Sequence, residues 1–146
     1  MYHTILAPLD GSKRAEAILP HLEEMARRYE AKVIFMQVIE PVSTIVGPEI
    51  AYFDQGKEEF EELKKQVEAY LSGLKGEFRQ KGIEARTLVV DGPVVGAIIN
   101  AAERENADII AIASHGRGGL SRVFYGSVAA GVLQRIDRPL LIIRST

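Results

Sequence analysis

The sequence of 146 residues contains no cysteine, which excludes a disulfide framework, a thiolate nucleophile and a cysteine-ligated zinc site. An excess of one charge is also lacking, because 18 lysines and arginines stand against 20 aspartates and glutamates. That balance argues against a protein that binds the phosphate backbone of a nucleic acid. No apolar run approaches the roughly 18 residues of a membrane-spanning helix, and the N-terminus has no basic stretch before an apolar core. We therefore expect a cytoplasmic protein with neither a membrane nor a nucleic acid as its partner.

Familiar catalytic motifs are missing as well. The Gly56-Lys57 pair is followed by glutamate where a Walker A motif needs Ser or Thr. Ile112 stands where a nucleophile elbow around Ser114 needs its first glycine. The three histidines lie far apart without metal-ligand spacing, and His115 is expected to hydrogen-bond within its loop rather than act as a general base. These absences favour a binding site over a reaction centre.

Five short runs rich in apolar and β-branched residues predict strands buried on both faces of a sheet. They cover residues 4–9, 32–39, 85–90, 108–113 and 139–144. Between them, apolar residues recur at the three- and four-residue spacings of amphipathic helices. One such apolar stripe consists of Phe60, Leu63, Val67, Leu71, Leu74 and Phe78. Strict alternation of strand and helix predicts one α/β domain, residues 1–146, with a doubly wound parallel sheet and helices on both faces.

Local signals add three expectations. Pro20 lies inside the first helical pattern, where it should kink the helix or shift its start. The tripeptide Asp91-Gly-Pro93 predicts a helix cap with proline as the first helical residue. Residues 41–55 are irregular and fairly apolar, and we expect a loop there, either packed on the edge of the core or serving as a lid or interaction surface.

Polar, glycine-containing loops follow the first and fourth predicted strands. In a doubly wound sheet, ligands bind beyond the carboxyl ends of the strands, at the point where the strand order reverses. If these two strands are neighbours there, both loops line one crevice. Asp10, in the first loop, either caps the next helix or takes a ribose hydroxyl or a metal-bound water, and spacing alone leaves both roles open.

The second loop lies in the stretch ASHGRGGLSRVFYGS, residues 113–127. Glycines that would let backbone N–H groups approach an anion are Gly116, Gly118 and Gly119. Gly126-Ser127 opens the last predicted helix, whose N-terminus favours negative charge. Ser127 is expected either to cap this helix or to contact a phosphate oxygen, and Arg117 and Arg122 to add cationic contacts. The alternative is that this stretch forms only a helix cap and a loose turn.

Three motifs in order resemble the universal stress protein family over essentially the whole chain. They are ILAPLDGS at residues 5–12, the run from Ala113 to Ser127, and DRPLLIIR at residues 137–144. The middle run is similar to that family's ATP-binding pattern of glycine, two residues, glycine, nine residues, glycine, then Ser or Thr. Ala113 replaces the first glycine; because a strand end normally has negative φ, alanine need not strain the backbone there, although its methyl group would approach the ligand.

The resemblance implies an adenine-nucleotide alpha-hydrolase-like fold with five parallel strands in the order 3-2-1-4-5. It implies a homodimer along the C-terminal strand, which would cover an apolar edge. Carried over to this sequence, Pro8 and Asp10 would line the adenosine pocket, with Asp10 near the ribose, and Val38 would meet adenine through its backbone. The ligand would be ATP, and magnesium with mostly water ligands would bridge its phosphates. The residues around the phosphates would be Ala113, Ser114, His115, Gly116, Arg117, Gly118, Gly119, Gly126, Ser127 and Val128.

The expected function is that of an ATP-binding universal stress protein, a dimeric nucleotide-dependent sensor or adaptor in the stress response, with slow hydrolysis at most. A competing hypothesis is an interaction protein of the same fold that binds no nucleotide and acts through its dimer surface or residues 41–55. A third is a small nucleotide-dependent enzyme, which the missing catalytic residues disfavour. The sequence does not identify the partner protein.

Overall fold

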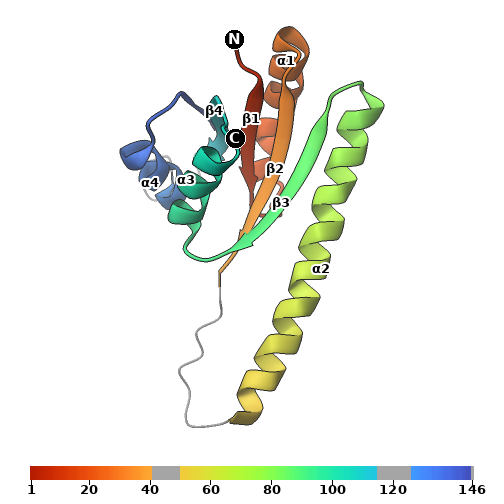
Figure 1. Ribbon diagram of the computed structural model, residues 1–146, viewed down its shortest axis with the longest axis vertical. Coiled ribbons are helices and arrows are strands. Elements are labelled where there is room, and N and C mark those ends of the chain that lie inside the picture. The colour runs from red at the N-terminus through yellow and green to blue at the C-terminus, as the bar shows by residue number, and fades with distance from the viewer. Residues whose placement is uncertain (41–49, 115–125, 146) are drawn as a thin grey trace.

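The computed structural model describes residues 1–40, 50–114 and 126–145, with the backbone alone for residues 50–56. Strands and helices alternate along this chain (Figure 1). The strands are β1 (Thr4–Leu9), β2 (Lys32–Ile39), β3 (Ala85–Asp91), β4 (Ile109–Ser114) and β5 (Leu140–Arg144). The helices are a short 3-10 helix, η1 (Ala15–Ile18), followed by α1 (Leu19–Tyr29), α2 (Ile50–Gln80), α3 (Val94–Arg104) and α4 (Ser127–Arg135).

The five strands form one parallel sheet in the order β3-β2-β1-β4-β5, which confirms the predicted fold. Ile5 of β1 lies opposite Val33 of β2 on one side and Ile109 of β4 on the other. The strand order therefore reverses between β1 and β4. Because parallel strands end at the same edge of the sheet, the carboxyl ends of β1 and β4 lie where a doubly wound fold binds its ligands.

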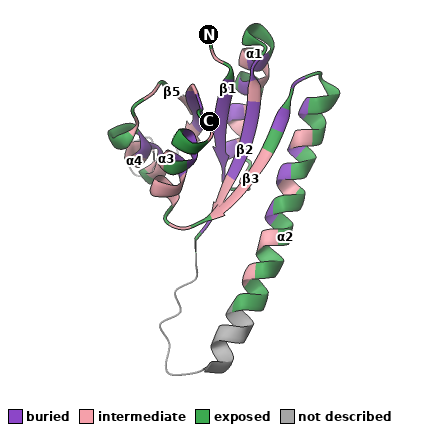
Figure 2. Cartoon of the chain, in the orientation of Figure 1, coloured by how far each residue is buried: buried purple, intermediate pink, exposed green. Residues whose placement is uncertain are grey.

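Helices cover both faces of the sheet, as predicted. Alternate residues of β1 point to opposite faces. Ile5 and Ala7 pack in the cluster that holds α1 and α2, while Leu6 packs in the cluster that holds α3 and α4. All six residues of β1 are buried, as the purple strand in Figure 2 shows. This two-sided burial explains why the strand sequences are continuously apolar instead of alternating.

Pro20 and Pro93 lie at the starts of α1 and α3. The prediction is confirmed for Pro20 and is wrong by one position for Pro93. The expected shift at Pro20 is confirmed: residues 15–18 form η1, and α1 begins at Leu19 with Pro20 in its first turn. A first-turn proline loses no intrahelical hydrogen bond, because the first N–H groups of a helix have no acceptor. The prediction for Pro93 is wrong by one position. Pro93 is the N-cap, with φ −63° and ψ 135°, and α3 begins at Val94.

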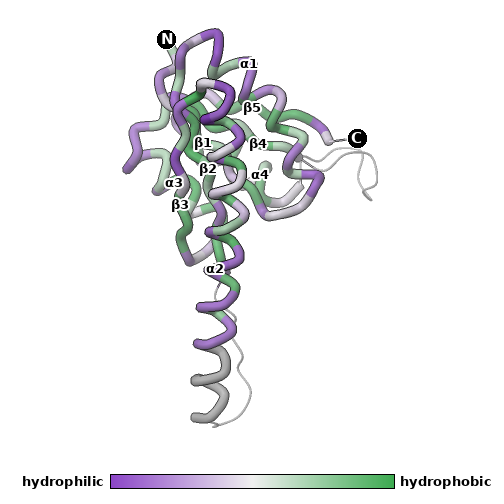
Figure 3. Tube along the Cα trace, turned by 90° about the vertical axis from the view of Figure 1, so that its right-hand side faces the viewer, coloured by the Kyte–Doolittle hydropathy of each residue, from purple (hydrophilic) through white to green (hydrophobic). Residues whose placement is uncertain are grey.

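Helix α2 is longer than the sequence predicts. The expected loop over residues 41–55 is wrong for its last part, because α2 begins at Ile50; residues 41–49 lie outside the described part of the chain. Figures 1 and 3 show that α2 runs well beyond the end of the sheet. Among the described side chains of α2, the buried ones belong to its C-terminal half, and they are Val67, Leu71, Leu74 and Phe78. Leu63, on the same predicted apolar stripe, is 43% exposed.

Strand β5 forms an edge of the sheet and pairs with β4. Arg138 fixes the chain just before β5, because its Nη1 donates to the carbonyl oxygens of Ala102 and Ala107, both at 2.8 Å. The side chains of residues 140–143 are half-buried. Among the described helices, none is both long and apolar enough to cross a bilayer.

Asp108 joins the starts of β1 and β4. Its Oδ2 accepts hydrogen bonds from the backbone N–H groups of His3, at 2.7 Å, and Thr4, at 2.8 Å. Burial raises the pKa of this carboxyl, but the two hydrogen bonds and the neighbouring His3 lower it more, so the pKa lies below its ordinary value. The ionised form of Asp108 therefore stabilises the folded state.

We expect Asp108→Asn to lower the free energy of unfolding at pH 7 by about 1 kcal/mol, because solvent partly screens this half-buried group. A carboxyl with a lowered folded pKa stabilises the fold above its unfolded pKa of about 3.9 and loses that contribution as the pH falls through the folded value. The difference between variant and wild type should therefore shrink at acid pH. Urea unfolding at several pH values measures this, with the exposed Glu103→Gln as control. A difference that is independent of pH would contradict the assignment.

Candidate functional site

A cavity of about 290 Å³ lies at the carboxyl ends of β1, β2 and β4, where α3 and α4 begin. Seven residues of the predicted site line it, from four separate segments of the chain: Pro8, Asp10, Val38, Ala113, Gly126, Ser127 and Val128. Sequence reasoning missed other lining residues with polar or charged side chains, which are Arg14, Gln37 and Glu40. The apolar part of the wall includes Val94, Ile98 and Ile112.

The remaining predicted residues lie elsewhere or outside the described chain. Ser114 is buried at the end of β4, where its Oγ donates to the carbonyl oxygen of Ile143 at 3.3 Å, and it is not among the described residues that line the cavity. The predicted contacts at His115, Gly116, Arg117, Gly118 and Gly119 fall in residues 115–125, which the structure does not describe, as does Arg122.

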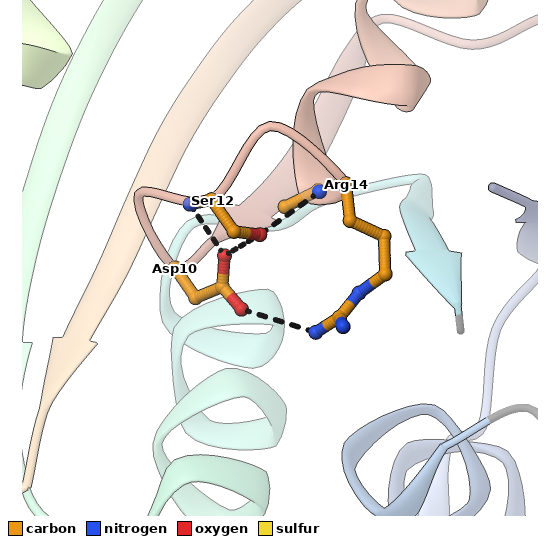
Figure 4. A network of polar contacts seen from close by, with 4 residues as sticks. Asp10, Ser12 and Arg14 are labelled. Atoms are coloured by element: carbon orange, nitrogen blue, oxygen red, sulfur yellow. Dashed lines mark hydrogen bonds and ion pairs between the residues drawn. The ribbon is translucent and has the colours of Figure 1, made fainter. Parts of the chain in front are cut away.

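The loop after β1 is a tight turn built on the Asp10 carboxylate (Figure 4). Asp10 Oδ1 accepts from the backbone N–H of Ser12 at 2.9 Å and from the Ser12 hydroxyl at 2.6 Å. Ser12 Oγ in turn accepts from the N–H of Ala15 at 3.1 Å, at the start of η1. Gly11 takes φ +86°, which glycine tolerates and most residues do not. The helix-capping role left open for Asp10 therefore belongs to Ser12, and Asp10 orients Ser12.

Asp10 presents an ionised carboxylate at the cavity wall. Burial raises its pKa, but the hydrogen bonds from Ser12 and the nearby Arg14 cation outweigh that effect, and the pKa lies below its ordinary value. The Asp10 side chain remains 58% exposed. Its second oxygen, Oδ2, lies 3.8 Å from Arg14 Nη2, which is too long for a hydrogen bond. This oxygen can accept a hydrogen bond from a ligand.

Helix α2 supports η1 and thereby the turn. Tyr70 of α2 donates its hydroxyl proton to Glu16 Oε2 of η1 at 2.5 Å. Burial and this carboxylate both raise the pKa of Tyr70, so the hydroxyl stays protonated and remains a donor. The contact joins segments 54 residues apart in the sequence.

The N-terminus of α4 forms another part of the cavity wall. Gly126 is its N-cap, with φ 87° and ψ 157°, a region of backbone conformation that is essentially restricted to glycine. The prediction of Ser127 as N-cap is wrong: Ser127 is the first helical residue and is exposed, and no side chain of the described residues caps the helix. The N–H groups of this first turn have no intrahelical acceptor, so they and the positive end of the helix dipole favour an anion.

A close helix contact fixes α4 beside α3. A Cβ atom added to Gly131 would lie 2.7 Å from Cγ2 of Val95, a distance that carbon atoms do not adopt. Glycine at this position therefore lets the two helices approach, which brings Val94 of α3 and Val128 of α4 to the same cavity.

Gln37 provides a buried acceptor in the cavity wall. Its Oε1 is fully covered and has no hydrogen-bond donor within the described part of the chain. The carboxamide lies beside the Asp10 turn, with Nε2 3.8 Å from where a Cβ on Gly11 would be. Leaving such an acceptor unpaired costs about 1–3 kcal/mol, which is more typical of a binding site than of passive packing. Its signal in the sequence is one polar residue within the apolar run of β2.

The described residues include no group of three or more acidic or histidine side chains that could hold a metal ion. Taken together, the walls offer an apolar surface, a carboxylate acceptor and a helix N-terminus. They suit a ligand with an apolar part, donor hydroxyl groups and an anionic group.

Known proteins are similar to this chain in both sequence and fold. Universal stress protein MJ0577 of Methanocaldococcus jannaschii is 29% identical over 99% of this chain and 96% of its own. Its solved structure gives a TM-score of 0.83 at 28% identity and covers 100% of this chain and 98% of its own.

Two more distant structures share the fold and hold nucleotides. A universal stress protein in complex with cAMP has a TM-score of 0.72 at 20% identity, covering 99% of this chain and 98% of its own. One from Archaeoglobus fulgidus in complex with dAMP has a TM-score of 0.65 at 21% identity, covering 98% of each chain. The sequence profile described as "Universal stress protein family" matches residues 1–144. The chain belongs to the universal stress protein family.

Proposed function

We propose that this chain binds ATP in the cavity between β1 and β4 and acts as a dimeric, nucleotide-dependent sensor or adaptor in the stress response. One observation carries the proposal: the Asp10 carboxylate and the N-terminus of α4 line the same cavity. A hydroxyl-bearing sugar and an anionic phosphate group are the ligand parts that these two features bind. Two proteins of the same fold in complex with cAMP and dAMP support an adenine nucleotide as the ligand class.

The proposed placement follows the chemistry of the walls. Adenine lies against the apolar side chains near Val38 and Ile98, the ribose donates its hydroxyls to Asp10, and the phosphates lie toward Gly126 and Ser127. The cavity of about 290 Å³ is close to the lower limit of roughly 300 Å³ for small-molecule sites. Magnesium, when bound with ATP, would neutralise phosphate charge and take most ligands from the nucleotide and water. The described side chains add no cluster of acidic ligands for it.

A sensor role with slow hydrolysis at most fits the described lining. The described lining includes no histidine, and the Asp10 carboxylate that could act as a base is engaged by Ser12 and faces Arg14. A sensor of cellular ATP needs only modest affinity, because a millimolar dissociation constant corresponds to about −4 kcal/mol. We place the dimer along β5, whose apolar side chains lie at a sheet edge that a second copy would pair.

The test begins with the purified protein, which is denatured so that any released small molecule can be identified. The emptied protein is then titrated with MgATP while its thermal unfolding is followed. Binding should stabilise it by RT ln(1 + [L]/Kd), about 2.7 kcal/mol at a hundredfold excess over Kd. Asp10→Asn should weaken the affinity for MgATP about tenfold, because it removes the negative charge that faces the ligand. The asparagine keeps an oxygen that can accept the hydrogen bonds from Ser12.

Glu84→Gln is the matched control, since it removes an exposed carboxylate at the opposite edge of the sheet. An emptied wild-type protein that does not respond to millimolar MgATP would contradict the proposal. That outcome would favour an interaction protein acting through its dimer surface or residues 41–55. Fast turnover of ATP would instead identify an enzyme.

A further inference from the structure

Arg14 carries a positive charge into the cavity, at a position that the family-like motifs of the sequence do not include. It lies just before η1, four residues after Asp10, and its side chain is 40% exposed. Among the described residues that line the cavity, Arg14 is the one cation, while Asp10 and Glu40 are acidic. Figure 4 shows its side chain extending from the turn, with one guanidinium nitrogen toward Asp10.

The contact between Arg14 and Asp10 is weak. Nη2 and Oδ2 are 3.8 Å apart, both side chains are well exposed, and the guanidinium makes no hydrogen bond within the described chain. Exposed ion pairs of this kind contribute little to stability, because solvent screens them and ordering two side chains costs entropy. Moving the guanidinium from Asp10 to another anion therefore costs little.

A phosphate is the anion that fits this place. Arg14 shares the cavity with Gly126 and Ser127, so a ligand that fills the cavity meets a cation as well as the N-terminus of α4. A phosphate has more negative charge than a carboxylate and matches the planar guanidinium with two parallel hydrogen bonds. When Arg14 turns to it, Asp10 Oδ2 loses its cationic neighbour and is open to a donor such as a sugar hydroxyl.

We propose that Arg14 binds a phosphate of the nucleotide and makes the site prefer nucleotides to nucleosides. This inference rests on the proposed function, since it assigns one residue of that site to one part of the ligand. In the empty protein Arg14 lies near Asp10, and in the filled protein it exchanges the carboxylate for the phosphate. Arg14 thus determines specificity, and Asp10 and the apolar wall bind the nucleoside part.

The test compares affinities for ATP and adenosine, measured by isothermal titration calorimetry at about 0.15 M salt. Arg14→Gln should weaken ATP binding about tenfold and leave adenosine binding within about twofold, because one charge-assisted contact to phosphate is lost. The ATP affinity of Arg14→Lys should lie between those of the wild type and Arg14→Gln, since lysine keeps the charge without the bidentate geometry. Arg79→Gln, an exposed arginine at the end of α2 and outside the cavity lining, should change neither affinity.

The outcomes separate the two proposals. Equal weakening of ATP and adenosine by Arg14→Gln would mean that Arg14 acts through Asp10, and would overturn the phosphate contact. Unchanged affinity for both ligands would overturn it as well. In either case wild-type protein that binds ATP leaves the proposed function standing. Wild-type protein that binds neither ligand at millimolar concentration would overturn the proposed function, and this inference with it.

Discussion

Truncation of Phe35 to alanine should destabilise the protein by about 3–5 kcal/mol, which is a large part of the roughly 5–15 kcal/mol that keeps a domain folded. Phe35 has no exposed surface and lies in the middle of β2, an interior strand between β3 and β1. Its ring meets that of Phe78 of α2 edge to face, with centroids 4.9 Å apart and planes at 89°. Removing it loses buried apolar area and leaves a cavity where α2 rests on the sheet.

Urea unfolding followed by far-UV circular dichroism measures this loss. Leu63→Ala in α2, the helix of Phe78, is the control. It should lower the free energy of unfolding by well under 1 kcal/mol, because Leu63 is 43% exposed. A double-mutant cycle with Phe35→Leu and Phe78→Leu should give a coupling of about 0.5–1.5 kcal/mol for the ring pair. Equal losses for Phe35→Ala and Leu63→Ala would mean that α2 does not pack as described.

Leu63 also shows where sequence periodicity reaches its limit. The three- and four-residue spacing predicts an apolar face through Leu63 and Phe78 alike, and it finds the helix correctly. Periodicity states which residues share a face, but it does not state where the sheet beneath them ends. Among the described side chains of α2, the buried ones lie in its C-terminal half; Phe78 is one of them, whereas Leu63 is 43% exposed. Irregular composition before residue 56 concealed the start of the same helix.

Strands were easier to predict because burial on both faces removes polar residues. The run VIFMQVI in β2 shows the rule and its exception: the interruption is Gln37, whose Oε1 is buried without a donor in the described chain. Arg14 was missed for a different reason. Charged residues near a helix start are common and usually face water, so only the three-dimensional cavity distinguishes Arg14 from Lys13. Gln37 and Arg14 are candidates for ligand contacts because of their position in the cavity wall, rather than because of their residue type.

Replacing Gly126 with alanine should both destabilise the protein and weaken MgATP binding. With φ 87° and ψ 157°, Gly126 has a backbone conformation that a residue with a Cβ adopts at a cost of about 1–3 kcal/mol. The chain can relieve this strain by turning the peptide groups at the start of α4. That movement redirects the first-turn N–H groups that we propose to face the phosphates, and we expect affinity to fall about tenfold.

Gly76→Ala is the matched control for this substitution. Gly76 lies on the exposed face of α2 with nothing within 4 Å of an added Cβ, so alanine there should raise stability by up to about 1 kcal/mol. Thermal unfolding with and without MgATP separates the two effects, because stability is read from the empty protein and affinity from the shift. A Gly126→Ala protein that is destabilised but binds MgATP as tightly as wild type would contradict the role of α4. The phosphates would then be held by side chains, with Arg14 the first to examine, rather than by the backbone of the helix start.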